Sequence, residues 1–161
     1  MPIAKPQTAQ SQEVVFLTRE HHDGLLLSWK INSGLNKGVS LKRIKEYVIY
    51  FFENFLEPHL LMEEQIIYSL VDAEQPDRRM AELQHAGLRV RIEYFKAGYA
   101  MAANILRDFA QLLSDHIRFE ERVLFQLIEE QADPVALRSV VKKYKNVLTV
   151  DNGWRDQFWL K

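Results

Sequence analysis

The sequence predicts an all-α protein: an up-down-up-down four-helix bundle with a short fifth helix and a C-terminal tail. Three observations lead to this fold class. Apolar residues recur at helical spacing over most of the chain. No segment alternates apolar and polar residues between hairpin turns. The six glycines and five prolines fall mainly between the periodic segments, which makes the connections short.

The first predicted elements are an arm and a helix. Residues 1–12 are polar and are expected to form a flexible arm. A helix is predicted from about Val14 to Ile31. It should end in the stretch NSGLNKG, where Gly34 and Gly38 are typical of a turn.

Three further long helices complete the predicted bundle. Ser40 is a suitable N-cap for the second, which runs through LKRIKEYVIYFFENFLEPHLLMEEQIIYSLV. Pro58 lies inside it, and because proline has no backbone N–H we expect the helix to be kinked or interrupted there. A third helix is predicted from about Asp77 to Lys96. Gly98 separates it from a fourth, which ends near Gln131.

The C-terminal part is expected to cover the bundle. Asp133 and Pro134 combine an N-cap with a first-turn proline, which predicts a short fifth helix to about Asn146. The tail ends in WRDQFWLK, which is rich in aromatic residues. We therefore expect residues 13–131 to form the bundle and residues 132–161 to pack on it. A homodimer contact through these aromatic residues is the alternative.

Composition excludes several classes of function. The chain of 161 residues has 21 basic and 22 acidic residues and a net charge of −1, which argues against nucleic acid and anionic membranes as partners. It has no cysteine, so disulfides, thiolate metal sites and cysteine nucleophiles are excluded. No apolar run approaches about 18 residues, and the N-terminus has no apolar signal segment. We expect a single-domain cytoplasmic protein.

One motif occurs twice, in PHLLMEEQIIYSL (58–70) and DHIRFEERVLFQL (115–127). Aligned on the histidines, both read H-x-x-x-E-E-x-x-[IL]-[YF]-x-L. Glu63 and Glu120 lie four residues after His59 and His116, so each shares a helix face with its histidine. The apolar residues that follow at helical spacing direct that face into the core. The repeat predicts a pseudo-twofold relation between the second and fourth helices.

The first and third helices also carry histidines. His85 precedes Leu88 and Ile92 at helical spacing, so its face is apolar. His21 and His22 are adjacent, and only one of them can point directly into the core. The helical wheel favours His21, which lies opposite the polar residues of its helix. The similarity of HDGL to HAGL, which begins at His85, favours His22 instead, so His22 remains an alternative ligand or a support for the ligands.

A metal site explains these buried polar groups. Burying them without partners would cost several kcal/mol. Imidazole and carboxylate together suit iron or manganese and also accept zinc. Four histidines and two carboxylates are too many for one tetrahedral zinc and suit two ions bridged by the carboxylates. The adjacent Glu64 and Glu121 are expected to be surface charges, because they are turned by about 100° on the helix.

The pattern resembles the hemerythrin-like (HHE cation-binding) domain family over about residues 14–131. The resemblance rests on the segments FLTREH, PHLLMEE, LQHAGL and DHIRFEERVLF. It implies a hemerythrin-like bundle with a non-haem di-iron centre bridged by the two glutamates, with zinc or manganese as substitutes. The implied ligands are His21, His59, Glu63, His85, His116 and Glu120.

Two departures separate the chain from the oxygen-carrying members of that family. Those members have a second histidine one turn along the third helix, where this chain has Arg89. Their fourth-helix carboxylate is an aspartate five residues after its histidine, where this chain has Glu120 four residues after His116. The ligand set is closer to bacterial di-iron members linked to iron–sulfur repair and nitric oxide stress, and to iron-sensing relatives. The repair proteins usually carry an N-terminal cysteine-bearing segment, which this chain lacks.

The resemblance implies a non-haem di-iron protein that binds or senses iron, oxygen or nitric oxide. The alternative is a di-iron redox enzyme or an iron donor in oxidative or nitrosative stress defence. A third interpretation is a helical interaction protein in which the site is structural. The expected partner is a diatomic ligand (oxygen or nitric oxide) or peroxide, with a homodimer as a further option and neither nucleic acid nor membrane.

Overall fold

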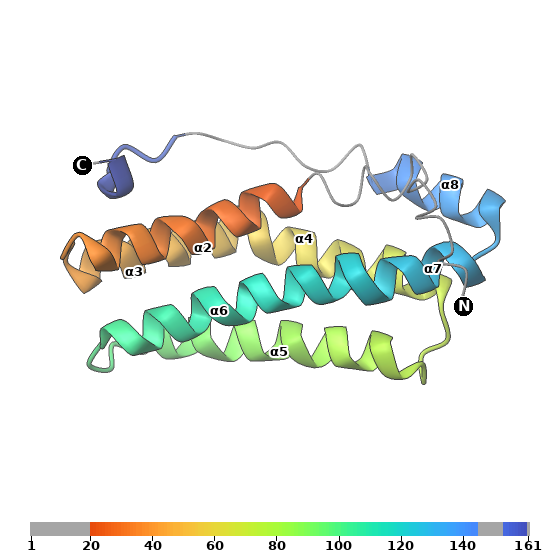
Figure 1. Ribbon diagram of the computed structural model, residues 1–161, viewed down its shortest axis with the longest axis horizontal. Coiled ribbons are helices and arrows are strands. Elements are labelled where there is room, and N and C mark those ends of the chain that lie inside the picture. Colours follow the sequence, from red (N-terminus) through yellow and green to blue (C-terminus); the bar gives the residue numbers. More distant parts are fainter. Residues whose placement is uncertain (1–19, 145–152, 161) are drawn as a thin grey trace, which may run out of the picture.

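The computed structural model describes residues 20–144 and 153–160, and every regular element within these ranges is helical (Figure 1). Four helical rods run up, down, up and down, so the predicted fold class is confirmed. The first rod packs against the second and fourth, and the third does the same, which closes the bundle. The rods are α2 (His21–Asn36), α3 (Leu41–Phe51) continued by α4 (Glu57–Met62), α5 (Pro76–Lys96), and α6 (Ala103–Phe119) continued by α7 (Phe125–Gln131).

The first rod ends later than predicted. We expected its end near Ile31, but α2 continues to Asn36, and Gly38 follows with a φ of 71°. Gly34, assigned to a turn, is buried inside the helix. A Cβ atom added to Gly34 would lie 2.8 Å from the ring of Phe158. This glycine therefore reflects the close approach of the C-terminal tail and not the end of the helix.

The second rod is helical throughout, but its α-helical hydrogen bonding is interrupted. A π-helical segment, η1 (Phe52–Leu56), lies just before Pro58, and the N–H of Glu57 bonds to the carbonyl of Phe52, five residues back. Since Pro58 has no N–H to donate, a wider turn beside it accommodates the missing hydrogen bond. The interruption that we expected at Pro58 is therefore a π-helical turn just before it.

Two further π segments begin at the motif glutamates. They are η2 (Glu63–Ile67) in the second rod and η4 (Glu120–Leu124) in the fourth. The N–H of Tyr68 bonds to the carbonyl of Glu63, and the N–H of Phe125 bonds to that of Glu120. The repeat thus extends to the backbone, whereas η1 has no counterpart in the continuous helix α6. Single π turns within helices often mark functional sites. The short η3 (Tyr68–Leu70) ends the second rod.

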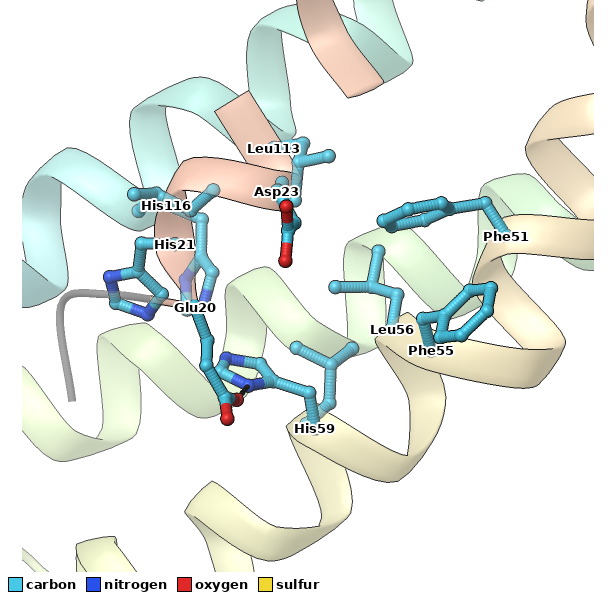
Figure 2. A pocket seen from close by; sticks show the side chains of 12 residues that line it. Glu20, His21, Asp23, Phe51, Phe55, Leu56, His59, Leu113 and His116 are labelled. Atoms are coloured by element: carbon cyan, nitrogen blue, oxygen red, sulfur yellow. Dashed lines mark hydrogen bonds and ion pairs between the residues drawn. The ribbon is translucent and has the colours of Figure 1, made fainter. Parts of the chain in front are cut away.

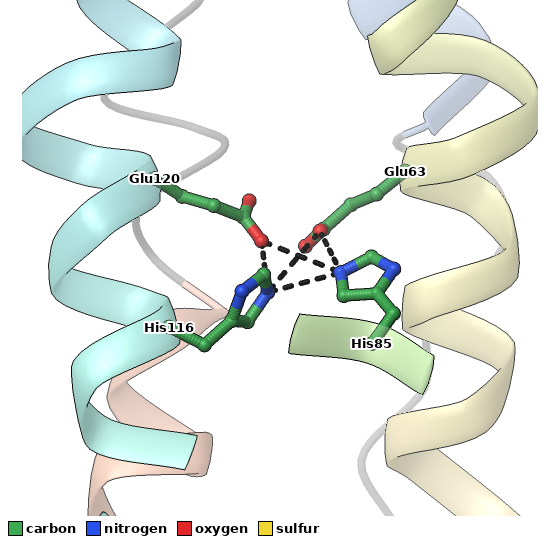
Figure 3. Close-up of side chains that lie close together, drawn as sticks. All are labelled: Glu63, His85, His116 and Glu120. Atoms are coloured by element: carbon green, nitrogen blue, oxygen red, sulfur yellow. Dashed lines mark hydrogen bonds and ion pairs between the residues drawn. The ribbon is translucent and has the colours of Figure 1, made fainter. Parts of the chain in front are cut away.

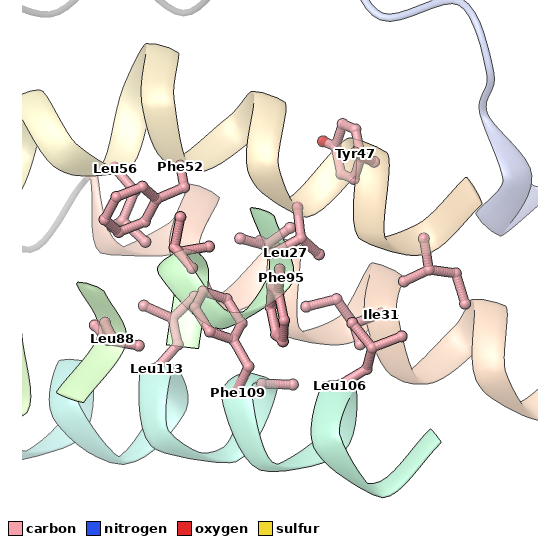
Figure 4. Close-up of a cluster of buried hydrophobic side chains, with 14 of the residues drawn as sticks. Leu27, Ile31, Tyr47, Phe52, Leu56, Leu88, Phe95, Leu106, Phe109 and Leu113 are labelled. Atoms are coloured by element: carbon pink, nitrogen blue, oxygen red, sulfur yellow. The ribbon is translucent and has the colours of Figure 1, made fainter. Parts of the chain in front are cut away.

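The apolar core has two parts. The larger cluster draws on all four rods and includes Leu27, Phe52, Leu88 and Phe109 (Figure 4). The smaller cluster joins η2, η4 and α7 to α8 and includes Ile67, Leu124, Ile128 and Val141. Along the second and fourth rods, the histidine and first glutamate of each repeat lie where the larger cluster gives way to the smaller. Apolar side chains therefore shield them from water on both sides.

The fifth helix and the tail lie against the bundle. α8 (Pro134–Tyr144) follows Asp133, whose carboxylate accepts a hydrogen bond from the N–H of Ala136 at 3.2 Å. In the tail, the buried rings of Phe158 and Trp159 lie 5.7 and 5.0 Å from the ring of Tyr47. The homodimer contact remains a prediction. The predicted arm at 1–12, the start near Val14 and the end near Asn146 lie outside the described residues.

Candidate metal centre

The structure brings six predicted ligands into one cluster inside the bundle. No member of the cluster is more than 9% exposed, whereas the alternative, His22, is exposed. α2 and α5 each contribute one histidine, and the second and fourth rods each contribute a histidine and the glutamate that begins a π segment. The six residues are His21, His59, Glu63, His85, His116 and Glu120.

The four histidines form two pairs. The 21/59 half consists of His21 and His59, whose ring centroids are 5.5 Å apart. The 85/116 half consists of His85 and His116, whose Nε2 atoms are 2.9 Å apart. Each half supplies donor atoms that lie within 4.8 Å of one another, and Glu63 belongs to both groups.

Glu63 faces both halves. Its Oε1 contacts Nε2 of His59 and lies 3.5 Å from Nε2 of His21. Its Oε2 lies 3.3 Å from Nε2 of His85. One carboxylate oxygen is therefore available to each half.

Glu120 also directs one carboxylate oxygen towards each half, but its closer contacts are with the 85/116 half. Its Oε1 contacts Nε2 of His116 and lies 3.5 Å from Nε2 of His85 (Figure 3). Its Oε2 lies 3.7 Å from Nε2 of His21. Each glutamate thus directs one oxygen towards each half, although only Glu63 belongs to both groups of donor atoms.

The prediction that Glu64 and Glu121 are surface charges is wrong. The Oε1 of Glu64 lies 2.8 Å from Nδ1 of His85, and that of Glu121 lies 3.1 Å from Nδ1 of His21. Their side chains are only 24% and 29% exposed. Each glutamate reaches from one repeat of the motif to a histidine of the other half. A side chain turned by about 100° from the core-facing position faces a neighbouring rod here, which the wheel of a single helix does not show.

The other two histidines are held in a similar way. The Oε2 of Glu20 lies 3.3 Å from Nδ1 of His59, and the Oε1 of Gln84 lies 2.7 Å from Nδ1 of His116. All four Nδ1 atoms therefore have a partner oxygen that can accept a hydrogen bond. Partners of this kind fix the orientation and tautomer of histidines that bind metals.

These partners also define the internal symmetry. Glu20 directly precedes His21, and Gln84 directly precedes His85, so His21 and His85 are equivalent. Aligning HDGL with HAGL pairs His22 with His85, which is one residue away from the pairing that the structure shows. His22, which that alignment favoured, is exposed.

The cluster contains atoms that a cation would satisfy. With their protons on Nδ1, His85 and His116 turn unprotonated Nε2 atoms towards each other at 2.9 Å, where the lone pairs repel unless a proton or cation lies between them. Within the described part of the chain, Glu120 Oε2 is buried without a hydrogen-bond partner. Such an atom needs an explanation, and an ion is one of the usual ones. The residues present therefore fit a bound metal.

Protons balance the buried carboxylates when no cation is bound. Burial lowers the pKa of His21, but Glu121, Glu63 and Glu120 outweigh it and raise that pKa to about 10. The pKa of His85 is raised in the same way to about 11. A metal ion must displace these protons, so metal binding to the cluster is coupled to proton release.

A family model decides which proteins the chain is related to. The model of the hemerythrin HHE cation-binding domain matches residues 13–128. The chain belongs to this family. The match spans all six residues of the cluster, and the metal binding of HHE domains agrees with a buried set of imidazoles and carboxylates. No curated protein and no solved structure gives a significant match.

The cluster of this HHE domain contains one residue that the sequence analysis missed. The hydroxyl of Tyr68 is buried 3.1 Å from Glu63 Oε2, 3.0 Å from Glu120 Oε1 and 3.1 Å from His85 Nε2. On an α-helical wheel Tyr68 lies about 140° from Glu63 and faces elsewhere. The π hydrogen bond from Tyr68 to Glu63 stacks the two residues instead.

A pocket in the HHE domain leads to the 21/59 half (Figure 2). Its volume of about 70 Å³ exceeds the roughly 10–15 Å³ that one water needs, so it can hold a molecule of a few atoms. His21, His59 and His116 lie along it. Most of the remaining lining is apolar and includes Phe51, Phe55, Leu56 and Leu113, together with the acidic Glu20 and Asp23.

Proposed function

We propose that this HHE domain binds two non-haem iron ions and serves as a binding or sensing protein for oxygen or nitric oxide. The observation that carries the proposal is the division of Glu63 and Glu120 between two histidine pairs. Each half then offers two imidazole nitrogens and two carboxylate oxygens. This donor set suits iron, with manganese or zinc as substitutes.

The surrounding residues have defined tasks in this proposal. Glu64 and Glu121 keep the protons of His85 and His21 on Nδ1, so that Nε2 is free to bind a cation. The two apolar clusters exclude bulk water. When bound, iron supplies a centre that can coordinate a diatomic ligand or exchange electrons with it.

The pocket supports a small neutral ligand. Its apolar side chains give little compensation for the desolvation of an ion. The carboxylates of Glu20 and Asp23 disfavour anions in particular. Oxygen and nitric oxide meet both conditions, and peroxide in its neutral form does so as well.

A second candidate function is a redox enzyme or an iron donor in stress defence. It is favoured by the position of Glu20 and Asp23 beside the pocket, because two carboxylates give a cation a route to and from the histidines. The same iron site would then exchange its metal or turn over peroxide or nitric oxide. Both candidates are expected to share the six ligands.

Metal analysis of protein purified from iron-replete cells tests the proposal. We expect two iron ions per chain. Mixing the reduced protein with oxygen then separates the candidates, since a stable spectrum of a bound ligand indicates binding and rapid turnover indicates an enzyme. Protein that contains no metal, and takes up none when Fe(II) is added, would contradict both.

Glu64→Ala should weaken iron binding by about 10–100-fold, because the Nδ1 atom of His85 loses its carboxylate partner. Competition with a coloured chelator measures this change. Glu57→Ala is the matched control, because Glu57 also binds Arg89 but Glu64 alone of the two contacts His85. Equal losses in the two variants would show that the effect comes from Arg89 and not from the histidine.

A further inference from the structure

The repeated motif places one aromatic ring against each half of the site. The ring of Tyr68 stacks on His85, with centroids 5.4 Å apart and an interplanar angle of 27°. The ring of Phe125 stacks on His21 at 5.3 Å and 13°. Tyr68 and Phe125 occupy the same position of the motif, nine residues after its histidine. The two halves therefore differ at this position by a single hydroxyl group.

The Tyr68 hydroxyl is surrounded by donor atoms of the 85/116 half. It lies 3.0–3.1 Å from Glu63 Oε2, Glu120 Oε1 and His85 Nε2. Two donors at right angles, each about 2.1 Å from one ion, are about 3 Å apart. The phenol oxygen is therefore as far from each of these three atoms as two ligands of one cation are from each other.

Hydrogen bonding alone does not account for these contacts. The two carboxylate oxygens are acceptors, and the phenol has one proton, so it can donate to only one of them. A His85 ring that carries both protons can donate from Nε2 to the phenol oxygen, but the second carboxylate oxygen still receives no proton from the phenol. A cation among the four atoms would satisfy all of them.

The matching motif position in the 21/59 half carries no hydroxyl group. Phe125 has no oxygen, and on that side Glu120 Oε2 is the buried atom without a hydrogen-bond partner in the described chain. The nearest ring nitrogen of this half, Nε2 of His21, is 3.7 Å away from it. The pocket is lined by both histidines of this half, His21 and His59, and by one histidine of the other half, His116.

We propose that the phenol oxygen of Tyr68 is a fifth donor to the ion of the 85/116 half, and that Phe125 leaves the matching place in the 21/59 half free for a small molecule from the pocket. The inference rests on the proposed function, since it requires bound metal. On binding, the O–H bond of Tyr68 is exchanged for an O–metal bond, and the proton leaves to solvent. One residue would thereby make two nearly symmetric halves chemically different.

Visible absorption of the iron(III)-loaded protein tests the role of Tyr68. A phenolate bound to iron(III) gives a charge-transfer band in the visible range, which a hydrogen-bonded phenol does not. We expect the band in the parent protein and in Tyr47→Phe, which removes a buried phenol outside the site. We expect Tyr68→Phe to lack the band while keeping its iron content and its helical circular dichroism.

Phe125→Tyr tests the second part of the proposal. It should add a phenolate contribution to the band and weaken nitric oxide binding by about tenfold or more, because a protein oxygen would fill the free place. The double variant Tyr68→Phe/Phe125→Tyr should regain a band.

The outcomes separate the claims. Iron-loaded parent protein without the band, or Tyr68→Phe that keeps it, overturns the role of Tyr68 alone. A new band in Phe125→Tyr with unchanged nitric oxide affinity overturns the assignment of the free place. Parent protein that binds no iron overturns the proposed function and this inference with it.

Discussion

Glu63→Gln should reduce the iron content of the chain from two ions to nearly none. Glu63 gives one carboxylate oxygen to the 21/59 half and the other to the 85/116 half, so its loss would affect both ions of the proposed centre. The amide that replaces it carries no charge and offers one oxygen instead of two. Metal analysis after loading with Fe(II) and desalting measures the change.

Two variants make this result specific. Glu74→Gln removes a carboxylate whose side chain is 81% exposed and should leave two ions bound. His59→Ala removes a donor from the 21/59 half only, so about one ion should remain. If Glu63→Gln retained both ions, Glu63 would not be shared between them, and its bridging role would have to be abandoned.

Removing the metal should lower the thermal stability of the protein strongly. A ligand that binds only the folded state at 100 to 1,000 times its Kd stabilises it by about 2.7–4.1 kcal/mol. In a chain of this size each kcal/mol corresponds to about 2–4 °C, so each ion should raise the unfolding midpoint by about 5–15 °C. Calorimetry of the loaded, chelated and reloaded protein measures the shift.

The variant Glu63→Gln serves as the control for chelation. If it holds no metal, chelator should leave its unfolding midpoint unchanged, which separates metal removal from any direct effect of the chelator. Equal midpoints for loaded and chelated parent protein would instead indicate that the cation contributes nothing to the folded state. The four rods would then be held together by the apolar clusters alone.

The sequence was sufficient to predict the bundle and the six clustered residues. Helical periodicity gave the rods, and the twice-repeated motif identified His59, Glu63 and their equivalents in the fourth rod. His21 followed from the helical wheel, because α2 is regular where it carries this residue. These successes share one condition, which is that the chain is α-helical between the residue and the reference residues that place it. Glu63 and Glu120 still meet this condition, because the π segments begin at them and affect the residues that follow.

The misses have two causes. Tyr68 directly follows a π segment, where a wheel of about 100° per residue gives the wrong direction. Glu64 and Glu121 were missed because the direction they take faces a histidine of a neighbouring rod and not solvent. A signal for Tyr68 was present, since an aromatic residue follows the histidine at the same distance in both repeats. The sequence alone did not show where this aromatic ring points, because its direction depends on the π turn of the backbone before it.

The end of the first rod was missed for a different reason. Gly34 and Gly38 have the same local character in the sequence, but only Gly38 has a positive φ. Gly34 is required by the ring of Phe158, which is distant in sequence and approaches from the tail. No local pattern could have separated the two glycines, because the deciding contact is tertiary.

The π segments have a consequence for how such a site changes during evolution. Each contains one residue more than a regular α-helical turn, so the direction of Tyr68 depends on the number of residues after Glu63 as well as on their identity. If the same five residues formed a regular α-helix, Tyr68 would lie about 140° from Glu63 and the phenol would turn away, while all six histidines and glutamates of the cluster stayed in the sequence. A one-residue deletion there would instead place the tyrosine four residues after Glu63, where an α-helical turn stacks the two residues again. The oxygen donor can therefore be lost through a change of helical turn alone, without the loss of any ligand.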